Sequence, residues 1–414
     1  MDVEIEVPSH FLCPISMQLM RDPVTISTGI TYDRVSIERW LFTCRSRICP
    51  VTNQPLYDAV LTPNHTLRRL IQSWCTINSH HGFDPIPSPK KPVDKSEILK
   101  LIQDAKRHPE KQIKCLRRMR SIAQWSDGNR SCMEECSSDA VEFLTTVVLN
   151  ENNADSVSEA CDEALIVLHH LSLTDLQMRK LVNDGESGFI DALLRVMRSG
   201  TIRSRSHTMV LLRSLLEVAD PAQLAAIKPD VFQETARILK HGLSFPPHTI
   251  KASLELVVET VRWGRNRIKA AESGMVSVLV ELLIDTRERR LCELVLVALE
   301  QISRCAEGRA ELVEHAAGLA AVSKKILRVS HVASDRAVRI VCLVCRFCGS
   351  FRVLQEMVEV GVVSKLCLMI QVDCNERTKE RVKHVLGLHS RVWRDASCIP
   401  AHLLSSYPSL ENVN

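Results

Sequence analysis

A helical pattern that recurs along the chain constrains its fold more than any other feature. From Ser96 onward apolar residues follow a period of 3.6, and from residue 139 helix starts return roughly every 40–50 residues. These starts are Asp139, Gly188, Asp230, Gly274, Gly318 and Gly361. A second, more apolar helix is expected after each of the first five starts, over residues 161–171, 207–218, 250–263, 291–303 and 337–347. One such unit cannot bury its apolar face alone, so the units must stack into an α-solenoid.

The helix starts resemble armadillo repeats, and within that family they look like the third helix of each repeat. Glycine at the start suits a tight turn between helices. The resemblance implies a protein-binding solenoid over residues 96–414. Armadillo grooves of nuclear import receptors carry regular ladders of Asn and Trp, which these helices lack. A transport receptor is therefore disfavoured, and the sequence does not name the ligand of the groove.

Residues 8–75 follow a different plan. A small hairpin is expected around residues 27–29, flanked by the apolar residues Val24, Ile26, Ile30 and Tyr32. Asp33 is expected to be the N-cap of a central helix, its carboxylate accepting from backbone N–H groups of the first turn. One face of that helix carries Ile37, Trp40 and Leu41. Asn64 is expected to cap a closing helix whose apolar face is Leu67, Leu70, Ile71 and Trp74.

Two loops, a central helix and a hairpin are typical of a RING-like module, but the metal ligands are too few. Two zinc ions would require eight Cys or His ligands. The stretch offers six without a C-x-x-C pair: His10, Cys13, Cys44, Cys49, His65 and Cys75. We therefore expect no bound metal. Hydrogen bonds and ion pairs should hold the loops instead, from Asp22, Asp33, Arg34, Glu38 and Arg39.

Several runs in this stretch match one family in order and spacing. They are CPIS at residues 13–16, MRDPV at 20–24, GITYDR at 29–34, IERW at 37–40, CPVT at 49–52 and PNHTLR at 63–68. Residues 8–80 thus resemble a U-box, and the chain is most similar to plant U-box proteins with armadillo repeats. The resemblance implies a mainly α protein, with a small α+β, RING-like, zinc-free U-box followed by the armadillo solenoid.

The resemblance also implies a ubiquitin ligase that forms no covalent intermediate, so no catalytic residue is expected. Its partners would be a charged ubiquitin-conjugating enzyme, ubiquitin, and a substrate protein held by the armadillo repeats. Ubiquitin transfer would be accelerated by orientation. The docking residues that the resemblance implies are Cys13, Pro14, Ile15, Trp40, Pro50, Val51 and Asn53.

Within this set, Ile15 and Pro50 are expected to line a groove with Trp40 as its floor. An aliphatic residue, a proline and a tryptophan form a rigid apolar patch suited to a binding hot spot. Cys13 is expected to support the first loop, although a purely structural core role is equally compatible with a small apolar thiol.

Asn53 departs from the pattern. Many RING-like domains carry arginine or lysine at this position, where the side chain reaches both the conjugating enzyme and ubiquitin. An amide donates hydrogen bonds without charge. The rival hypothesis is therefore a non-catalytic armadillo scaffold with a degenerate U-box, against which Ile15, Trp40 and Pro50 argue.

Composition narrows the remaining classes. A net charge of +4, with basic and acidic residues interleaved, does not favour nucleic-acid binding. The first six residues are acidic and lack a signal-peptide pattern, so the 16 cysteines are expected to be reduced thiols of a cytoplasmic protein. No apolar run reaches the roughly 18 residues of a membrane span. No cofactor motif is recognised, and the sequence leaves a homo-oligomer open. Similarity to plant family members implies stress and immune signalling.

Two further segments resemble sites. Cys342, Cys345 and Cys348 have the spacing of a metal-binding run, but they are expected within a helix and are interpreted as core residues. The run at residues 203–206, Arg-Ser-Arg-Ser, is expected to be a solvated loop and not a phosphorylation site.

The boundaries that follow are a lead at residues 1–7, the U-box at 8–80, a linker at 81–95 and the solenoid at 96–414. Within the linker, four prolines in the eight residues 85–92 favour extended geometry.

Overall fold

The computed structural model describes residues 6–44, 46–81, 83, 93–125, 129, 132–134, 136–150, 157–171, 173–183 and 188–393. The chain divides into two compact units, residues 1–151 with 158–173, and residues 152–157 with 174–414. The proline run predicted at residues 85–92 lies outside the described residues.

The first unit begins with a small antiparallel sheet. Strand β1 (Pro23–Thr25) pairs with β2 (Thr31–Asp33), with Val24 opposite Tyr32. The turn between them contains Gly29 at φ 80°, a left-handed conformation that glycine adopts without steric cost. This confirms the predicted hairpin. A third strand, β3 (Thr62–Pro63), pairs with the other edge of β1 and was not predicted, because two residues carry no alternation pattern.

Helix α1 (Arg34–Glu38) follows the sheet and continues as a π-helical segment, η2 (Arg39–Thr43). The closing helix α2 (His65–Ile77) begins as predicted, because the Asn64 side chain accepts a hydrogen bond from the Leu67 N–H at 3.0 Å. The predicted apolar face of α2 is wrong in one position, since Leu70 is 54% exposed. Two short 3₁₀ turns, η1 (Ser9–Phe11) and η3 (Ser79–His81), complete this N-terminal module.

The N-terminal module has its own hydrophobic core. Its buried members are Phe11, Cys13, Met20, Val24, Ile26, Tyr32, Ile37, Cys49, Leu56, Ile71 and Cys75. Both strands of the hairpin, the central helix and the closing helix contribute to this cluster. Residues of the two predicted loops therefore pack into the same core as the regular elements.

The described residues of the first unit include four further helices: α3 (Lys95–Arg107), α4 (Pro109–Trp125), α6 (Ser137–Leu149) and α7 (Glu159–His170). Pro109 is the first residue of α4, where the missing N–H of proline costs nothing. The loop predicted at residues 126–138 is only partly described, and residues 132–134 within it are helical.

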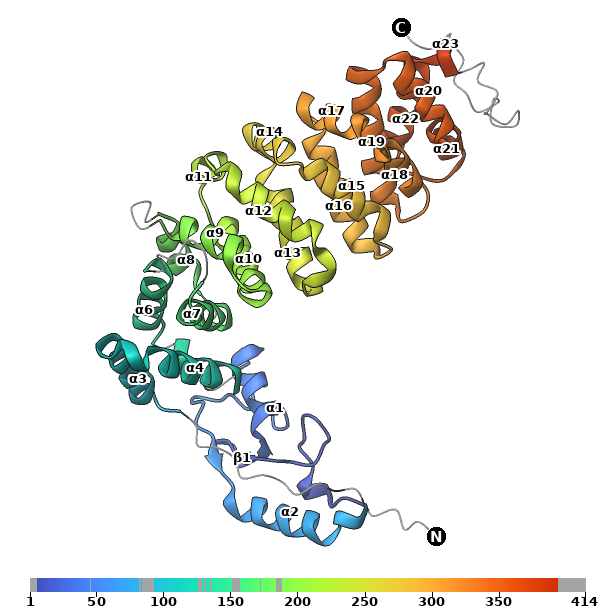
Figure 1. Ribbon diagram of the computed structural model, residues 1–414. Helices are drawn as coiled ribbons and strands as arrows, with labels where there is room; N and C mark the ends of the chain where they lie inside the picture. Colours follow the sequence, from blue (N-terminus) through green and yellow to red (C-terminus); the bar gives the residue numbers. More distant parts are fainter. Residues whose placement is uncertain are drawn as a thin grey trace. The chain divides into compact units, whose positions relative to one another are not determined.

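The second unit repeats a short, a middle and a long helix (Figure 1). The short helices are α8 (Asp175–Asn183), α11 (Pro221–Ala225), α14 (Gly264–Glu272), α17 (Ala306–Glu314) and α20 (Phe351–Glu359). The middle helices are α9 (Phe189–Ser199), α12 (Pro229–Lys240), α15 (Met275–Asp285), α18 (Gly318–Lys325) and α21 (Val362–Gln371). The long helices are α10 (Ile202–Glu217), α13 (Pro247–Thr260), α16 (Arg289–Ile302), α19 (His331–Cys348) and α22 (Glu376–Leu388). The turn η4 (Gly242–Ser244) and the short α23 (Ser390–Trp393) are further elements.

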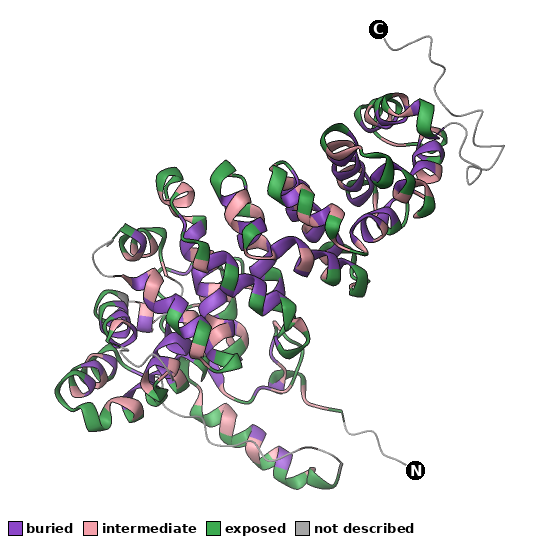
Figure 2. Ribbon diagram, turned by 45° about the horizontal axis from the view of Figure 1, so that its top comes forward, coloured by how far each residue is buried: buried purple, intermediate pink, exposed green. Residues whose placement is uncertain are grey.

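Each long helix of this unit packs on the long helix of the next repeat, from α10 through to α22. Figure 2 shows buried residues along the sides where helices meet and exposed residues on their outer sides. Stacking therefore supplies the core, as the sequence predicted. Within the described part of the chain, no helix is long and apolar enough to cross a membrane.

The glycine-led helices are the middle helix of each repeat when the count starts from the short one. Their assignment as third helices was therefore wrong, because it came from the resemblance alone, and the short helix that precedes each of them was not predicted. Gly188, Gly274 and Gly361 precede their helices at positive φ of 63°, 72° and 75°. Gly318 is needed for a different reason, since a Cβ there would lie 2.0 Å from the carbonyl oxygen of Leu312.

Two smaller predictions concern helices of this unit. The Arg-Ser run at residues 203–206 belongs to α10, and Ser204 and Ser206 are buried, so the predicted solvated loop is wrong. Cys342, Cys345 and Cys348 do lie in α19, with Cys345 buried, and this confirms the helical interpretation.

Candidate functional site

The first loop (residues 13–18) and the second loop (residues 49–54) have the same backbone geometry. In the first, the Cys13 N–H donates to the Gln18 carbonyl and the Met17 N–H to the Cys13 carbonyl, both at 2.8 Å. In the second, the Cys49 N–H donates to the Gln54 carbonyl at 2.8 Å, and the Asn53 N–H to the Cys49 carbonyl at 2.9 Å. The module thus presents two similar loops. The shared Cys-Pro-x-Ser/Thr-x-Gln pattern in the sequence was the signal that could have found them.

A buried cysteine sulfur organises each loop. The Cys13 sulfur accepts from the Asp33 N–H at 3.3 Å, and the Cys49 sulfur from the Thr28 hydroxyl at 3.4 Å. The Tyr32 hydroxyl shares a further hydrogen bond with the Cys49 sulfur at 3.2 Å. These contacts connect both loops to the hairpin, where a RING domain would use metal ligands.

The hydrogen bonds change the acidity of these groups. Burial of the Cys49 thiol disfavours its ionisation, but donors on Thr28, Thr52 and Tyr32 outweigh burial and lower its pKa to about 6. The pKa of Cys13 is lowered in the same way, by backbone donors that outweigh its burial. Burial raises the pKa of Tyr32, and the neighbouring Cys49 raises it further. Cys49 is therefore predominantly a thiolate at neutral pH, which strengthens the bonds that it accepts.

The Asp33 carboxylate stabilises the segment between the first loop and β1. Its Oδ1 accepts from the backbone N–H groups of Arg21 at 2.8 Å and Asp22 at 2.9 Å. Asp33 is the N-cap residue of α1, but its side chain makes no capping hydrogen bond, so the predicted role of its carboxylate was wrong.

An ion-pair chain adds to this support. Arg34 Nε lies 2.6 Å from Asp22 Oδ2, and Arg34 Nη1 lies 3.7 Å from Glu38 Oε1. Asp22, Asp33, Arg34 and Glu38 thus act as the predicted polar contacts. Arg39, the fifth predicted member, is exposed.

Trp40 joins the central helix to the second loop. It lies in η2, and its indole Nε1–H donates to the Ile48 carbonyl at 2.7 Å. Trp40 and Ile15 are both partly buried and pack against the module core. The indole orientation is therefore fixed from two sides, by the hydrogen bond and by the packing. Ile48 itself is 48% exposed and was not among the predicted docking residues.

The other predicted docking residues differ in accessibility. Cys13 is fully buried, so it contributes only by shaping its loop. Pro14 is exposed, Pro50 is partly exposed and Val51 is 50% exposed. The two loops thus hold apolar side chains in contact with solvent, as a docking surface requires.

Asn53 is exposed and has a left-handed backbone at φ 54°. Asparagine is enriched in that conformation among non-glycine residues, which gives a structural reason for this amino acid here. Met17, the equivalent residue of the first loop, has the same φ of 54°, so the loop geometry does not require asparagine.

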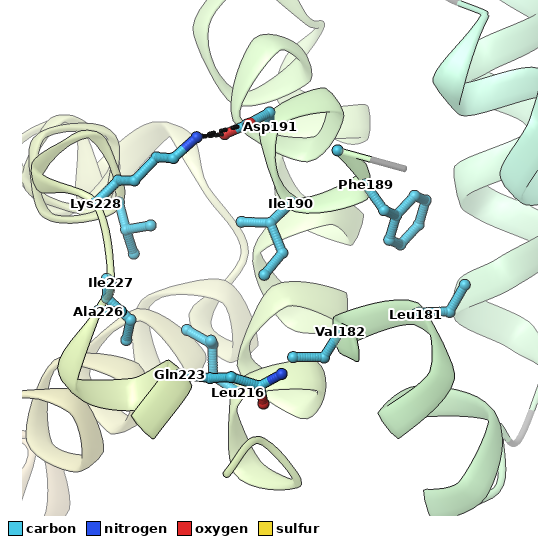
Figure 3. Close-up of a pocket in the computed structure, with 12 residues that line it drawn as sticks. Leu181, Val182, Phe189, Ile190, Asp191, Leu216, Gln223, Ala226, Ile227 and Lys228 are labelled. Carbon is cyan, nitrogen blue, oxygen red and sulfur yellow. Dashed lines mark hydrogen bonds and ion pairs between the residues drawn. The ribbon is translucent and has the colours of Figure 1, made fainter. Parts of the chain in front are cut away.

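No group of three or more His, Cys, Asp or Glu side chains suited to a metal ion occurs among the described residues. The second unit contains a pocket of about 230 Å³ between α8, α9, α10, α11 and α12 (Figure 3). Its lining is mainly apolar, including Val182, Phe189 and Leu216, and the Lys228 ammonium lies 2.7 Å from Asp191 at its edge. These two charges neutralise each other, so the pocket offers a contact surface and not an acid–base centre.

Comparisons with known proteins match both regions of the chain. Residues 7–80 match the family described as U-box domain, and residues 96–409 match the family described as plant U-box protein ARM repeat region. The E3 ubiquitin-protein ligase PUB23 of Arabidopsis thaliana is 48% identical, over 99% of this chain and 98% of that protein. The E3 ubiquitin-protein ligase PUB22 of the same plant is 45% identical, over 99% of this chain and all of that protein.

This chain belongs to the plant U-box proteins with armadillo repeats. A solved structure from a study of the interaction between cadherin and beta-catenin shares the solenoid fold, with a TM-score of 0.56 at 13% identity. The match covers 78% of this chain and 59% of the chain in that solved structure.

The family assigns the enzyme class. The chain is a U-box ubiquitin ligase, and such ligases transfer ubiquitin without a covalent intermediate. Its described features fit that class, because the U-box presents fixed loops and an anchored tryptophan and not an assembled nucleophile and base. The chemistry that such a surface contributes is orientation of two bound partners.

Proposed function

We propose that this U-box ligase docks a ubiquitin-charged conjugating enzyme on its two loops and Trp40. The observation that carries the proposal is the pair of equivalent loops, each fixed by a buried cysteine, with Trp40 hydrogen-bonded to the second. Ile15, Pro50 and Val51 present apolar surface there without needing to rearrange. Preorganised apolar anchors bind well because little conformational freedom is lost on association.

The experiment that tests docking is discharge of ubiquitin from a charged conjugating enzyme to free lysine. Val51→Asp and Ile15→Ala should lower the discharge rate about 30-fold, because loss of a central anchor costs roughly 2 kcal/mol. Val60→Asp is the matched control, since Val60 is 63% exposed in the same U-box and outside both loops. Equal activity of the Val51 and Val60 variants would refute the proposed surface, and Val51 is exposed enough that its variant should fold.

The armadillo solenoid is proposed to recruit the substrate protein. Its stacked repeats present an extended surface, which is how solenoids bind partners. The U-box at residues 8–80 and the solenoid from residue 96 are expected to fold separately, joined by the proline-rich linker. Tethering would then raise the effective concentration of substrate lysines near the docked conjugating enzyme.

Fragments test this division. Residues 1–80 alone should build ubiquitin chains but fail to modify the physiological substrate. Residues 96–414 should bind that substrate and protect it from the intact ligase. Equal substrate modification by the isolated U-box and the full chain would assign the solenoid another role, such as self-association.

Modified substrates are proposed to be degraded by the proteasome, in cytoplasmic stress and immune signalling. Family membership supports this step of the proposal. The measurement is substrate half-life in plant cells, with intact ligase against the Val51→Asp variant, in the presence and absence of a proteasome inhibitor. A half-life that does not depend on the variant or the inhibitor would contradict it.

A further inference from the structure

Five arginine side chains gather on the last three long helices of the solenoid. They are Arg304, just after α16, Arg336, Arg339 and Arg346 of α19, and Arg381 of α22. We call this group the arginine surface. Arg336, Arg339 and Arg346 follow one another at i, i+3 and i+10, so they form one stripe along α19. Because α19 packs on both α16 and α22, the outer two arginines flank that stripe.

Two carboxylates hold four of these arginines in place. Glu300, only 3% exposed, lies 2.8 Å from Arg304 and 3.1 Å from Arg336. Each bond connects the carboxylate to a partly exposed guanidinium, so Glu300 fixes the arginines without covering them. The cross-repeat pair Glu300–Arg336 also fixes the spacing between α16 and α19.

Asp335 has the same role in the following repeat. It lies 2.8 Å from Arg339 and 2.9 Å from Arg381, and it also accepts from the Thr378 hydroxyl at 2.8 Å. Although burial opposes ionisation, Thr378 and the arginines lower the pKa of Asp335, so its charged form is favoured.

Positive charge on the arginine surface exceeds negative charge. Four guanidinium groups share two carboxylates, and the fifth, Arg346, is exposed and lies 5.4 Å from the centre of the Phe347 ring. Burial raises the pKa of the Cys342 thiol on α19, and the charges of Arg381 and Arg346 both oppose that rise. Both guanidinium groups therefore lie near Cys342 and near each other. Of the acidic neighbours on the same helices, Glu293 pairs with Arg289 at 3.1 Å and Glu376 with Lys379 at 3.5 Å. Glu380 is exposed on α22, one position before Arg381, so at most three carboxylates face five arginines.

Aromatic surface lies at the end of the same stripe. Phe347 is 56% exposed and Phe351 is 72% exposed, and the Arg309 guanidinium lies 4.5 Å from the centre of the Phe347 ring. Guanidinium groups held in position are suited to bind carboxylates. The exposed aromatic rings beside them can contact an apolar side chain of the same peptide. A nucleic acid would require a longer run of cations to follow its phosphates.

We propose that the arginine surface binds an extended segment of a partner protein that is rich in Asp and Glu and contains an aromatic or aliphatic residue. This inference rests on the proposed recruitment role of the solenoid and names the class of segment that it would recruit. Arg304, Arg339 and Arg346 bind the carboxylates, and Phe347 contacts the apolar residue. Glu300 and Asp335 keep the cations spaced when no partner is bound.

The test uses the full chain and three short fluorescent peptides, made of glutamates, glutamines or lysines around one central phenylalanine. Fluorescence anisotropy should show binding of the glutamate peptide alone, weakened at high salt because exposed pairs are screened. Arg346→Glu and Arg346→Gln should weaken it, the charge reversal by about tenfold, or about 1.4 kcal/mol. Arg203→Glu is the matched control, because Arg203 is an exposed arginine of another long helix, α10, and its reversal changes net charge equally.

Any of the following results would overturn the proposal: equal binding of the glutamine peptide, equal weakening by Arg203→Glu, or tighter binding of a single-stranded oligonucleotide than of the glutamate peptide. A requirement for phosphate groups on the peptide would also contradict it. Circular dichroism of Arg346→Gln checks folding, since this exposed side chain forms no described ion pair.

A second measurement separates this inference from the proposed function. The glutamate peptide is fused to a lysine-bearing reporter, and its ubiquitination is compared between intact ligase and Arg346→Glu. If Arg346→Glu loses reporter modification while autoubiquitination is unchanged, the result supports both the arginine surface and substrate recruitment by the solenoid. Peptide binding without reporter modification would keep the surface and contradict recruitment. Solenoid-dependent modification of the physiological substrate without peptide binding would contradict the surface alone.

Discussion

The Asp33 carboxylate provides a sharp test of how the U-box holds the segment that joins its first loop to β1 without metal. It accepts two backbone hydrogen bonds, from Arg21 at 2.8 Å and Asp22 at 2.9 Å. A hydrogen bond to a charged acceptor contributes about 1.5–3 kcal/mol. The Arg21 donor is exposed and can bond to water instead, whereas the Asp22 donor is part-buried and cannot do so fully. Asp33→Ala should therefore favour local opening of this segment by about 2 kcal/mol.

That free energy corresponds to about a 30-fold increase in the open population. Native-state hydrogen exchange of the full chain measures it directly, because protection of an amide reports the opening equilibrium. Protection of the Arg21 and Asp22 amides should fall about 30-fold in Asp33→Ala and by less in Asp33→Asn, which keeps an acceptor without its charge. Amides of helix α16 should not change, since they belong to the other compact unit.

Asp58→Ala is the matched control, because Asp58 is an exposed acid of the same U-box. The rate of ubiquitin discharge should fall in Asp33→Ala, by a factor no larger than the fall in amide protection. The rate should stay unchanged in Asp58→Ala. If the Arg21 and Asp22 amides kept their protection in Asp33→Ala, the Asp33 carboxylate would not be what holds this segment in place. That result would refute the reasoning.

Three further predictions concern the second loop and metal. Asn53→Arg should speed ubiquitin discharge, because a guanidinium supplies a charged, forked donor, while left-handed strain costs up to about 1 kcal/mol of stability; a rate unchanged with several conjugating enzymes would contradict this. The Cys49 thiol has a pKa of about 6 when folded, against about 8.5 when unfolded, so the unfolded state binds more protons between these values. Its contribution to stability is therefore lost as pH falls through 6 and grows toward about pH 8.5. Hydrogen-exchange protection of the Thr52 amide, corrected for the pH dependence of intrinsic exchange, should rise with pH in the same way, and Cys49→Ser should remove that dependence. If protection in Cys49→Ser depended on pH as it does in the unchanged protein, the Cys49 thiolate would not be its cause. A strong chelator should leave discharge activity and melting temperature unchanged with a metal-free conjugating enzyme, and stoichiometric zinc lost together with activity would show that a metal holds the loops.

Much of the fold was predictable because its signals are local. Helix periodicity depends on neighbours three and four positions away, so the middle helices of the second unit and the long helices α10, α13, α16 and α19 were found from their apolar spacing. The last long helix, α22, was not predicted. The hairpin and the Asn64 cap were found for the same reason, since turn and cap residues lie beside the bonds they make. The short helices α8, α11, α14, α17 and α20 were missed, because each spans about two turns or less and so repeats its apolar positions too few times to give a clear period.

The candidate site was only partly predictable. The motif residues indicated which loops matter, but Asp33 was assigned to its own helix because a local cap is what sequence proximity suggests. In the folded chain its acceptor oxygen bonds amides 11 and 12 residues earlier, since the hairpin returns β2 to the first loop. The role of Ile48 was equally hidden, because a backbone carbonyl leaves no trace in the sequence.

The sequence by itself determined that stacked helices would bury apolar faces and that residues 8–80 would form a U-box, because both depend on repeated local patterns. The tertiary structure decided which side chains act together. Arg336 bonds a carboxylate 36 residues away, and Arg381 one 46 residues away, so the arginine surface exists only once the repeats are stacked. Such pairs depend on the packing angle and register of neighbouring helices, which no local spacing encodes.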